Sequence, residues 1–430
     1  MRTVLSGGGR GGSAGFRKRY YTANRRPCQG NSRPLIFLAP TALYCYTSCY
    51  MARIMIIAGE VSGDLHGGQL VAELRARVPE LDLYGIGGDR MAARGVDLVH
   101  HVRDLSFMGV AEVLLHLPFI RSVMRGLTAL LDTRRPDLVV LIDYPGFNLR
   151  FARQAKRRGI PVVYYVSPQV WAWGRGRVRK IRRLVARMLV ILPFEQQFYR
   201  DRGIPALYVG NPLIELAAPS LSPDAFRAGM GLDATRPLVG LLPGSRCQEV
   251  EAILPVMLAT CRMLREQEPS LQFVLALAPH IDRERVASLV ADSGLDAVLA
   301  ESLPYDVMAH SRLALVASGT ATLETGIIGT PMIVIYKTSA LTYWLGRLLV
   351  RVPYIGLVNL VAGKQVVPEF VQGDARPGAI FLMARLLLAD GGPRSAMMEG
   401  LAAIRARLAP AGAAARAAAE IAQLLPDRSA

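Results

Sequence analysis

The chain of 430 residues lacks an uninterrupted apolar run long enough to span a bilayer. The most apolar stretch, Leu341 to Leu360, is broken by Arg347 and Arg351. We therefore expect no transmembrane anchor, although 51% of the residues are hydrophobic. The surplus of apolar side chains must lie in buried cores or on a surface that binds apolar molecules.

Cysteine and histidine are scarce. The five cysteines form no Cys-x-x-Cys pair, and the six histidines show no metal-ligand spacing. Neither a His-Glu-x-x-His sequence nor the Asp-x-Asp pair of metal-dependent sugar transferases is present. These absences argue against a disulfide framework, a structural zinc and a catalytic metal, so we expect no metal and no cofactor.

Acidic residues are missing from residues 1–50, which carry eight Lys or Arg. This segment is rich in Gly, Arg and Ser, which favours disorder. A basic, acid-free start can also mimic a secretory signal or a transit peptide. We favour a simpler interpretation, in which translation begins at Met51, because the first strand pattern, Ile54–Ala58, follows with no room for a cleavage linker.

The formal net charge is +17, and a second basic run, Gly174 to Arg187, holds seven Lys or Arg and no acid. Such a run attracts nucleic acid, phosphorylated ligands or an anionic membrane, or it is simply a solvated helix face. Trp171 and Trp173 precede it, and aromatic residues for base stacking are not interleaved through it. An anionic membrane surface is therefore the favoured partner, and nucleic acid is not expected.

From Met51 onward, strand-like runs alternate with helical patterns, which is typical of parallel-sheet α/β domains. Two such series predict twin Rossmann-like domains, at residues 51–215 and 216–377, facing a cleft. Residues 378–430 are expected to form C-terminal helices. The predicted strands are Ile54–Ala58, Leu81–Gly85, Leu138–Asp143, Val162–Val166 and Met188–Leu192, then Leu238–Leu242, Gln272–Ala276, Ala297–Ala300, Leu313–Ala317 and Met332–Tyr336.

Two loops of the second domain suit a nucleotide. Small residues after one predicted strand would let a phosphate approach the backbone N–H groups of the next helix. Glu324, about one turn into that helix, could accept hydrogen bonds from ribose hydroxyls. In the other loop Ser245 could cap a helix, and Arg246 would stabilise a diphosphate leaving group. Either loop alone is more often an ordinary capped strand–helix connection. The small residues are Ser318, Gly319, Thr320 and Ala321.

The first domain has a comparable pair of loops. One contains Gly59 and Gly63, with Ser62 or Asp64 as a plausible helix cap. In the other, Asp143 ends a predicted strand at the edge where open α/β sheets bind ligands. Its carboxylate could take a proton from an attacking hydroxyl, or it could merely open a turn before Pro145.

The segment Leu105 to Ile120 is apolar on nearly every side, with Glu112 as its only charged residue. A buried hairpin or helix explains this composition. A patch that holds acyl chains or faces a membrane explains it equally well and is the sharper hypothesis.

Together these segments resemble the lipid-A-disaccharide synthases of Gram-negative bacteria over residues 53–425. The most specific block is Tyr165-Val-Ser-Pro-Gln-Val-Trp-Ala-Trp173. The other matching motifs are Gly59-Glu-Val-Ser-Gly-Asp64, Phe107-Met-Gly-Val-Ala-Glu-Val113, Asp143-Tyr-Pro-Gly-Phe-Asn148, Leu192-Pro-Phe-Glu195, Leu242-Pro-Gly-Ser-Arg246, Ala317-Ser-Gly-Thr-Ala321 and Asn359-Leu-Val-Ala-Gly363. Residues 1–50 have no counterpart in the family.

The resemblance implies an inverting, metal-independent enzyme of the GT-B architecture whose C-terminal helices cross back to the first domain. It would transfer 2,3-diacylglucosamine from UDP to the 6-hydroxyl of 2,3-diacylglucosamine 1-phosphate, on the cytoplasmic face of the bacterial inner membrane. It also admits a homodimer, because some members are swapped dimers.

The same resemblance assigns roles to single residues. Asp143 would be the general base and Arg246 the contact to the donor diphosphate, while Glu324 would bind the ribose and Asn359 would belong to the donor site. Glu60 and Ser62 would face the acceptor. The candidates for holding acyl chains are Met108, Val110, Val113, Leu114 and Leu117.

Two other classes of protein remain as alternatives. A UDP-N-acetylglucosamine 2-epimerase has similar nucleotide loops but acts on a soluble sugar, so it has no use for an apolar 105–120 segment. A non-catalytic peripheral membrane module could keep the loops as relics, although intact Asp143, Arg246 and Glu324 argue against decay.

Overall fold

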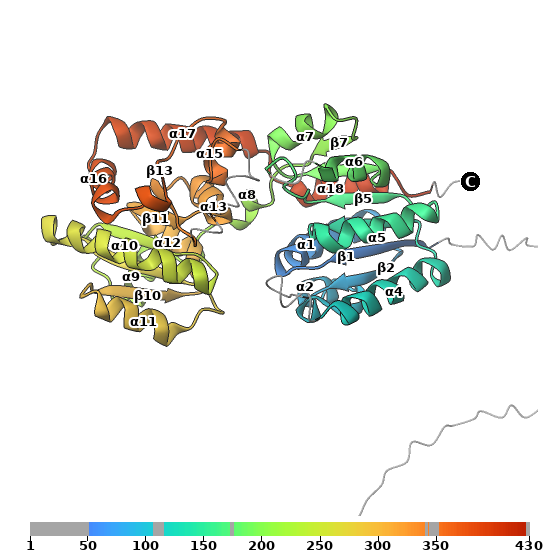
Figure 1. Cartoon of the computed structure of the whole chain (residues 1–430), viewed down its shortest axis with the longest axis horizontal. Coiled ribbons are helices and arrows are strands. Elements are labelled where there is room, and N and C mark those ends of the chain that lie inside the picture. Colours follow the sequence, from blue (N-terminus) through green and yellow to red (C-terminus); the bar gives the residue numbers. More distant parts are fainter. Residues whose placement is uncertain (1–50, 106–115, 173–175, 340–342, 344–351, 427–430) are drawn as a thin grey trace, which may run out of the picture. The chain divides into compact units, whose positions relative to one another are not determined.

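The computed structural model describes residues 51–105, 116–172, 176–339, 343 and 352–426 (Figure 1). Among these residues no helix is long and apolar enough to cross a membrane. The described chain forms two parallel sheets, each covered by helices on both faces, and each is built on the same strand order.

The first sheet has seven described strands in the order β3-β2-β1-β4-β5-β6-β7, and all the neighbours are parallel. Its strands are β1 (Ala52–Ala58), β2 (Leu81–Gly87), β3 (Asp97–His101), β4 (Leu138–Ile142), β5 (Val162–Tyr165), β6 (Arg187–Val190) and β7 (Ala206–Tyr208). Its helical segments are α1 (Val61–Arg77), α2 (Asp89–Ala92), η1 (Val102–Asp104), α4 (Leu117–Thr133), α5 (Pro145–Arg157), α6 (Gly176–Leu184) and α7 (Pro193–Arg200).

Alternation along each strand assigns the two faces of this sheet, because successive side chains point to opposite sides. Met55 and Ile57 of β1 pack with α4, α5 and α6, whereas Ile54 and Ile56 pack with α1. Both faces are buried, so the strands are near-continuous hydrophobic runs. This burial is why β1 and β4 were recognisable in the sequence.

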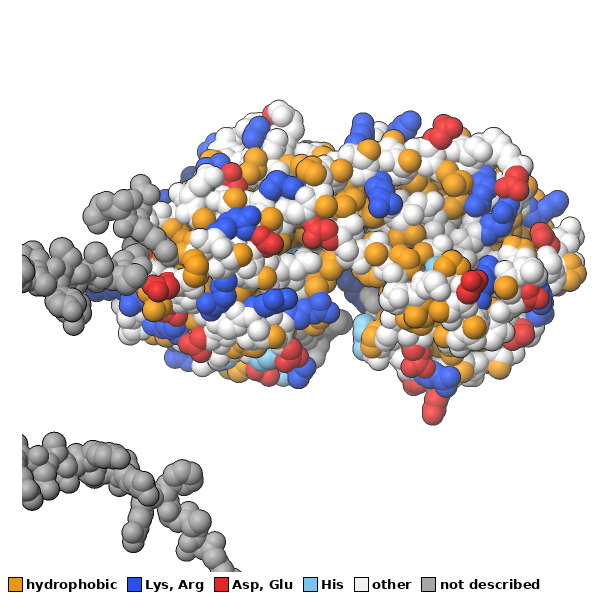
Figure 2. Space-filling model, turned by 180° about the vertical axis from the view of Figure 1, so that it is seen from behind, with side chains coloured by type: hydrophobic (Ala, Val, Ile, Leu, Met, Phe, Trp, Pro, Cys, Tyr) orange, Lys and Arg blue, Asp and Glu red, His pale blue; other side chains and the backbone are white. Residues whose placement is uncertain are grey.

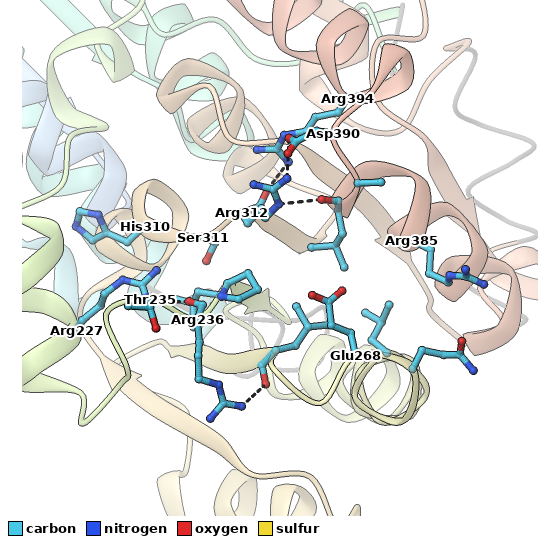
Figure 3. Close-up of a pocket in the computed structure, with 17 residues that line it drawn as sticks. Arg227, Thr235, Arg236, Glu268, His310, Ser311, Arg312, Arg385, Asp390 and Arg394 are labelled. Carbon is cyan, nitrogen blue, oxygen red and sulfur yellow. Dashed lines mark hydrogen bonds and ion pairs between the residues drawn. The ribbon is translucent and has the colours of Figure 1, made fainter.

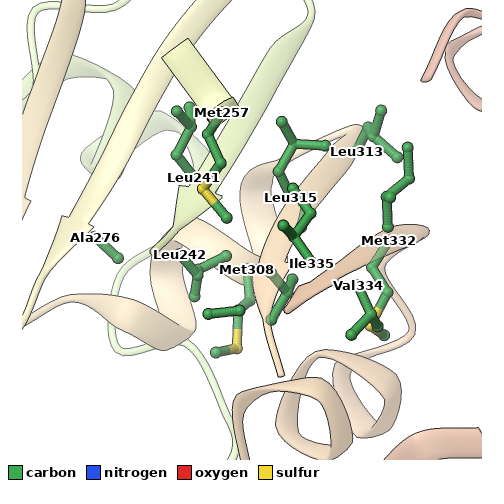
Figure 4. Close-up of a cluster of buried hydrophobic side chains, with 14 of the residues drawn as sticks. Leu241, Leu242, Met257, Ala276, Met308, Leu313, Leu315, Met332, Val334 and Ile335 are labelled. Carbon is green, nitrogen blue, oxygen red and sulfur yellow. The ribbon is translucent and has the colours of Figure 1, made fainter. Parts of the chain in front are cut away.

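The second sheet has six described parallel strands in the order β10-β9-β8-β11-β12-β13. Figure 4 shows Leu241, Leu315 and Met332 among the buried side chains of its core. The strands are β8 (Leu238–Leu242), β9 (Gln272–Leu277), β10 (Ala297–Glu301), β11 (Leu313–Ala317), β12 (Met332–Tyr336) and β13 (Glu369–Val371). The helical segments from the linker to the end of this domain are α8 (Leu213–Leu216), α9 (Pro223–Gly229), α10 (Cys247–Gln267), α11 (Arg283–Asp292), α12 (Pro304–His310), α13 (Thr320–Ile328), α15 (Leu357–Ala362) and η2 (Gln372–Asp374).

Three helices follow: α16 (Pro377–Leu388), α17 (Gly392–Leu408) and α18 (Ala413–Ala422). The first two pack on the second domain, and α18 returns to the first, where Ala417, Ala418 and Ile421 share a buried cluster with Leu70 and Val71 of α1. The expected crossing back to the first domain is therefore made by α18, whereas the expectation that all the helices of residues 378–430 pack there is wrong for α16 and α17.

The sequence missed β3, β7 and β13, and each of them is an edge strand. β7 and β13 contain only three residues each, and β3 contains Asp97, His100 and His101. Edge strands are often short and polar because one side has no partner strand, so they lack the apolar run that marks a central strand.

Candidate functional site

Both sheets have a topological switch point, where adjacent strands continue to opposite faces and leave a crevice at their carboxyl ends. It lies between β1 and β4 in the first sheet and between β8 and β11 in the second. The loops after these four strands are the loops that the sequence analysis singled out. The parallel order therefore brings Glu60 near Asp143, and Ser245 and Arg246 near residues 318–321.

In the second domain, a cavity of about 1150 Å³ lies at this switch point. Its wall contains the expected donor-site residues except one: Ser245, Arg246, Ser318, Gly319, Thr320, Ala321 and Glu324. Gln169, Trp171 and Ala172 also line it. The volume is large enough for a nucleotide-sized ligand.

Helix α13 begins at this cavity with Gly319 as its N-cap, and no side chain caps its first N–H groups. The Ser318 side chain instead donates to the Ile355 carbonyl at 3.1 Å. An uncapped helix start inside a cavity suits an anion, since the first N–H groups lack intrahelical acceptors. Glu324 accepts a hydrogen bond from the Tyr305 hydroxyl at 3.0 Å, and burial raises the pKa of its carboxyl.

Arg246 is the N-cap residue of α10, and its guanidinium forms an ion pair of 2.5 Å with Glu249. Its side chain is 69% exposed, so the charge is accessible to a ligand in the cavity. The expectation that Ser245 caps this helix is wrong, because the helix begins two residues later and has no side-chain cap. The Ser245 carbonyl instead contacts the His280 ring.

Asn359 does not line the cavity, in contrast to the expectation. Its side chain is fully buried, and its amide bonds Glu369 and the backbone of Val366 and Val367. Glu369 does line the cavity, and it accepts bonds from the Ile355 and Gly356 N–H groups. Asn359 therefore positions a wall residue, and nothing in the sequence distinguished that task from ligand contact.

In the first domain, Asp143 and Tyr144 follow β4 with φ values of 46° and 47°. Two consecutive non-glycine residues in this left-handed region are unusual and strained. The Asp143 carbonyl is held there by the Asn148 amide at 2.7 Å and by the Tyr164 hydroxyl at 2.5 Å. The Tyr144 ring takes the space that a side chain on Gly59 would need, since an added Cβ would lie 2.2 Å from it.

Burial, with a smaller contribution from the nearby charge of Glu60, raises the pKa of Asp143 to about 6. A carboxyl with such a pKa is ionised at neutral pH and still basic enough to take a proton. Glu60 and Ser62 are exposed at the start of α1. Neither Ser62 nor Asp64 caps this helix. Asp64 instead accepts bonds from the N–H groups that open α2.

Most of the candidates for holding acyl chains or facing a membrane lie outside the described residues: Met108, Val110, Val113, Leu114 and Trp173. Leu117 is half-buried at the start of α4. Trp171 is 8% exposed and donates its ring N–H to Glu195 at 2.9 Å, so the expectation that it faces a membrane is wrong. The sequence missed Glu195 in this role, although the motif that contains it was visible.

A second cavity, of about 860 Å³, lies at the amino ends of β8 and β11 (Figure 3). Its arginines serve backbone carbonyls: Arg394 bonds those of Arg312 and Leu387, Arg312 bonds that of Leu388, and Arg236 bonds that of Ser270. Basic side chains at helix C-termini satisfy orphan carbonyls and offset the helix dipole. These contacts account for the arginines structurally, and we assign the cavity no ligand.

Comparisons with known proteins agree with this geometry. The family model described as lipid-A-disaccharide synthetase matches residues 54–418. The lipid-A-disaccharide synthase of Myxococcus xanthus is 47% identical over 87% of this chain and 98% of its own length. That of Geobacter metallireducens is 44% identical over 87% of this chain and 97% of its own length.

Solved structures share the architecture at low identity. The glycosyltransferase of kitacinnamycin has a TM-score of 0.60 at 18% identity, covering 87% of this chain and 99% of its own. The UDP-GlcNAc 2-epimerase from Neisseria meningitidis, solved with UDP-GlcNAc, has a TM-score of 0.59 at 15% identity, covering 86% and 98%. These likenesses show the GT-B fold of two Rossmann-like domains.

The raised pKa of Asp143 predicts how stability depends on pH. Because folding raises the pKa of Asp143 from its ordinary value of 3.8 to about 6, the wild type loses stability as pH rises from about 4 through 6 and loses no more above that. Asp143→Asn removes this cost and tolerates the left-handed backbone. We expect the variant to gain up to about 3 kcal/mol over wild type as pH rises from about 4 to 6, with no further change up to pH 8, measured by urea unfolding.

Asp132→Asn is the matched control. The hydrogen bond from Arg158 lowers the pKa of the exposed Asp132, so this replacement should lose stability relative to wild type as pH rises toward about 4 and show a constant difference above it, the opposite sign to Asp143→Asn. A stability difference for Asp143→Asn that does not change with pH would contradict the raised pKa.

Proposed function

We propose a catalytic mechanism for this chain, which belongs to the lipid-A-disaccharide synthetase family and is a glycosyltransferase of lipid A synthesis. In the proposed reaction, 2,3-diacylglucosamine passes from UDP to the 6-hydroxyl of 2,3-diacylglucosamine 1-phosphate. The observation that carries the mechanism is the pairing of loops at two switch points, with a basic carboxylate at one and an anion-binding cavity at the other.

The donor would occupy the cavity of the second domain. Its diphosphate would lie at the start of α13 and against Arg246, while Glu324 would accept bonds from the ribose hydroxyls. As the bond from the sugar to the diphosphate breaks, negative charge grows on UDP. A guanidinium and unpaired N–H groups aimed at that charge stabilise the transition state more than the ground state.

The acceptor would lie at the switch point of the first domain, beside Glu60 and Ser62. Asp143 would take the proton of the 6-hydroxyl while its oxygen forms the new bond to the anomeric carbon and UDP leaves with the old bond's electrons. Attack from the face opposite to UDP inverts the configuration. Asn148 and Tyr164 bond the backbone carbonyl of Asp143 and so hold the turn from which its carboxyl projects, which favours the fixed position that such a transfer requires.

The first test follows UDP release by purified residues 51–430, with UDP-diacylglucosamine, in the presence or absence of diacylglucosamine 1-phosphate. Release that depends on the acceptor and yields a disaccharide supports the proposal. Turnover of plain UDP-N-acetylglucosamine, without transfer between the acylated sugars, would favour an epimerase-like activity instead.

In this assay, Asp143→Asn should lower kcat by roughly 10²–10⁴-fold, because the hydroxyl loses its general base.

For the wild type, kcat/KM should fall as pH drops through about 6, where Asp143 becomes protonated. Glu60→Gln removes a repulsive charge and should move this acidic limb to lower pH. If Glu60→Gln leaves the pH profile unchanged, the charge of Glu60 does not influence the pKa of the general base.

Arg246→Ala should weaken UDP binding and lower kcat/KM by roughly 10–100-fold, the loss typical of one charge-assisted hydrogen bond. The matched control is Arg262→Ala, which removes an exposed guanidinium from the same helix, α10. Calorimetric titration with UDP measures both. Equal UDP affinity in the two variants would show that Arg246 has no part in binding the diphosphate.

We further propose that helices α4, α5 and α6 dock on an anionic membrane. They lie side by side on one face of the first sheet (Figure 1). Their only acidic residue is Asp132, which is paired with Arg158. The exposed basic residues are Arg121, Arg125, Arg150, Arg153, Lys156, Arg157, Arg179, Lys180, Arg182 and Arg183. On the face seen in Figure 2, by contrast, basic and acidic side chains are interspersed.

A membrane-bound substrate pair gives this basic face a purpose, and Phe119 at the start of α4 adds an exposed apolar side chain. Each Lys or Arg near an anionic surface contributes roughly 1 kcal/mol. We therefore expect Arg153→Glu, Lys156→Glu, Arg179→Glu and Arg183→Glu, combined, to weaken binding to phosphatidylglycerol vesicles by at least about a hundredfold.

Vesicle sedimentation at low and high salt measures this loss. A control that reverses four exposed arginines outside the first domain, Arg262, Arg283, Arg285 and Arg405, should bind nearly as wild type. Equal losses in both variants would mean that net charge, rather than this face, drives the association.

A further inference from the structure

Glu195 is a fully buried carboxylate that the mechanism above does not use. It lies in the first turn of α7 and is 2% exposed. One of its oxygens accepts bonds from the Ser167 hydroxyl at 2.6 Å and from the Trp171 ring N–H at 2.9 Å. The other accepts the Leu192 N–H at 3.1 Å. No ion pair to Glu195 is found among the described residues, so hydrogen bonds alone compensate its burial.

Burying an unpaired carboxylate is costly, and burial raises the pKa of Glu195 to about 7. A buried polar group of this kind is retained where it specifies one arrangement of its neighbours. The neighbours here belong to the loop from Val166 to Ala172. The same loop starts at Val166, a strained residue with a φ of 59°. The Tyr199 hydroxyl holds this loop by donating a hydrogen bond of 3.1 Å to the Pro168 carbonyl.

Trp171 connects this loop to the donor cavity. Trp171 is one of the residues that line the cavity containing Arg246 and Ser318. It also packs edge-on against Phe194, with ring centroids 5.0 Å apart, and belongs to the same buried cluster as Leu242 and Ala317 of the second domain. An indole held by its ring contact with Phe194 and by its N–H has one orientation.

We propose that Glu195 is a positioning residue for UDP-sugar binding, which fixes the Trp171 ring as a wall of the donor cavity. The first domain thereby contributes to a site whose other walls come almost entirely from the second domain. This inference rests on the proposed function through the assignment of that cavity to the UDP-sugar. Glu195 itself touches no substrate.

Glu195→Gln tests the proposal because it keeps the shape and changes the pattern of donors. The three partners are all oriented as donors, and only the Ser167 hydroxyl can rotate to accept. Whichever way the Gln amide turns, the N–H of Trp171 or of Leu192 loses its acceptor. The expected result is a roughly tenfold rise in the Kd for UDP and in the KM for the donor, with kcat within about twofold of wild type.

The matched control is Gln197→Ala, which alters an exposed residue of the same helix that bonds only Asp201. It should leave the Kd for UDP unchanged. A purely structural role for Glu195 would lower the melting temperature of Glu195→Gln while the Kd for UDP stays at the wild-type value, and this outcome would overturn the proposal.

Trp171→Phe supplies an independent test that does not depend on Glu195→Gln folding. It removes the indole N–H and leaves the Ser167 bond to Glu195 in place. UDP should quench the tryptophan fluorescence of wild type and much less that of Trp171→Phe, and the Kd for UDP should rise severalfold. An unchanged Kd and an unchanged quench would overturn the proposal.

The double variant shows whether the two residues act together. If Glu195 acts by holding Trp171, Glu195→Gln should add no more than about twofold to the Kd of Trp171→Phe, whereas independent effects multiply. Failure of the proposed function has a different signature, in which wild type shows no transfer from the UDP-sugar to the acceptor. In that case the Kd for UDP still tests the link between Glu195 and Trp171.

Discussion

The topology of the parallel sheets determines where the candidate catalytic and binding residues lie. In each domain the strands end at one common edge, and at the switch point the two central strands lead to helices on opposite faces. The loops there cannot cover one another, so a crevice remains beside uncapped helix starts such as that of α13. In the proposed mechanism the same architecture, used twice, provides one crevice for a nucleotide and one for an acceptor. The solved structures of similar fold use it for other reactions, so the fold alone does not determine the chemistry.

Strain and buried polarity are concentrated around these crevices. Asp143, Tyr144 and Val166 adopt left-handed backbone conformations, and all three follow strands of the first sheet. Each costs free energy that regular structure would not. Asn148 and Tyr164 hold the first of these turns, and Glu195 holds the loop after the last. Stability is therefore partly exchanged for fixed geometry where ligands would lie.

The role of a charged side chain depends on its partners rather than on its position relative to the sheet. Near the amino ends of β8 and β11, Arg312 and Arg394 bond the carbonyls of Leu388 and Leu387 at the end of α16 and support the fold (Figure 3). Those on α5 and α6 project away from the core and leave a face without unpaired acid. Among the arginines that the structure describes, only Arg246 combines an exposed guanidinium with a place in the large cavity. The same residue type thus occurs in different surroundings, with carbonyls as partners in one place and, in the proposed function, lipid or a ligand in the others.

The sequence by itself determined the fold class, the central strands and the loops that carry Asp143, Arg246 and Glu324. It could do so because central parallel strands are continuous apolar runs, and because small and polar residues must follow them wherever ligands bind. The edge strands β3, β7 and β13 were not predicted, because a strand with one partner strand needs no continuous apolar run.

Only the tertiary structure decided which polar side chains face a cavity and which support its wall. The resemblance placed Asn359 in the donor site and gave Glu195 no role, yet both are buried and bond other parts of the protein. Trp171 looks like a membrane residue, yet it packs between the two domains' buried side chains. The physical reason is that burial and hydrogen-bond partners depend on segments far apart in the chain, whereas a local pattern reports only what its own strand or helix requires.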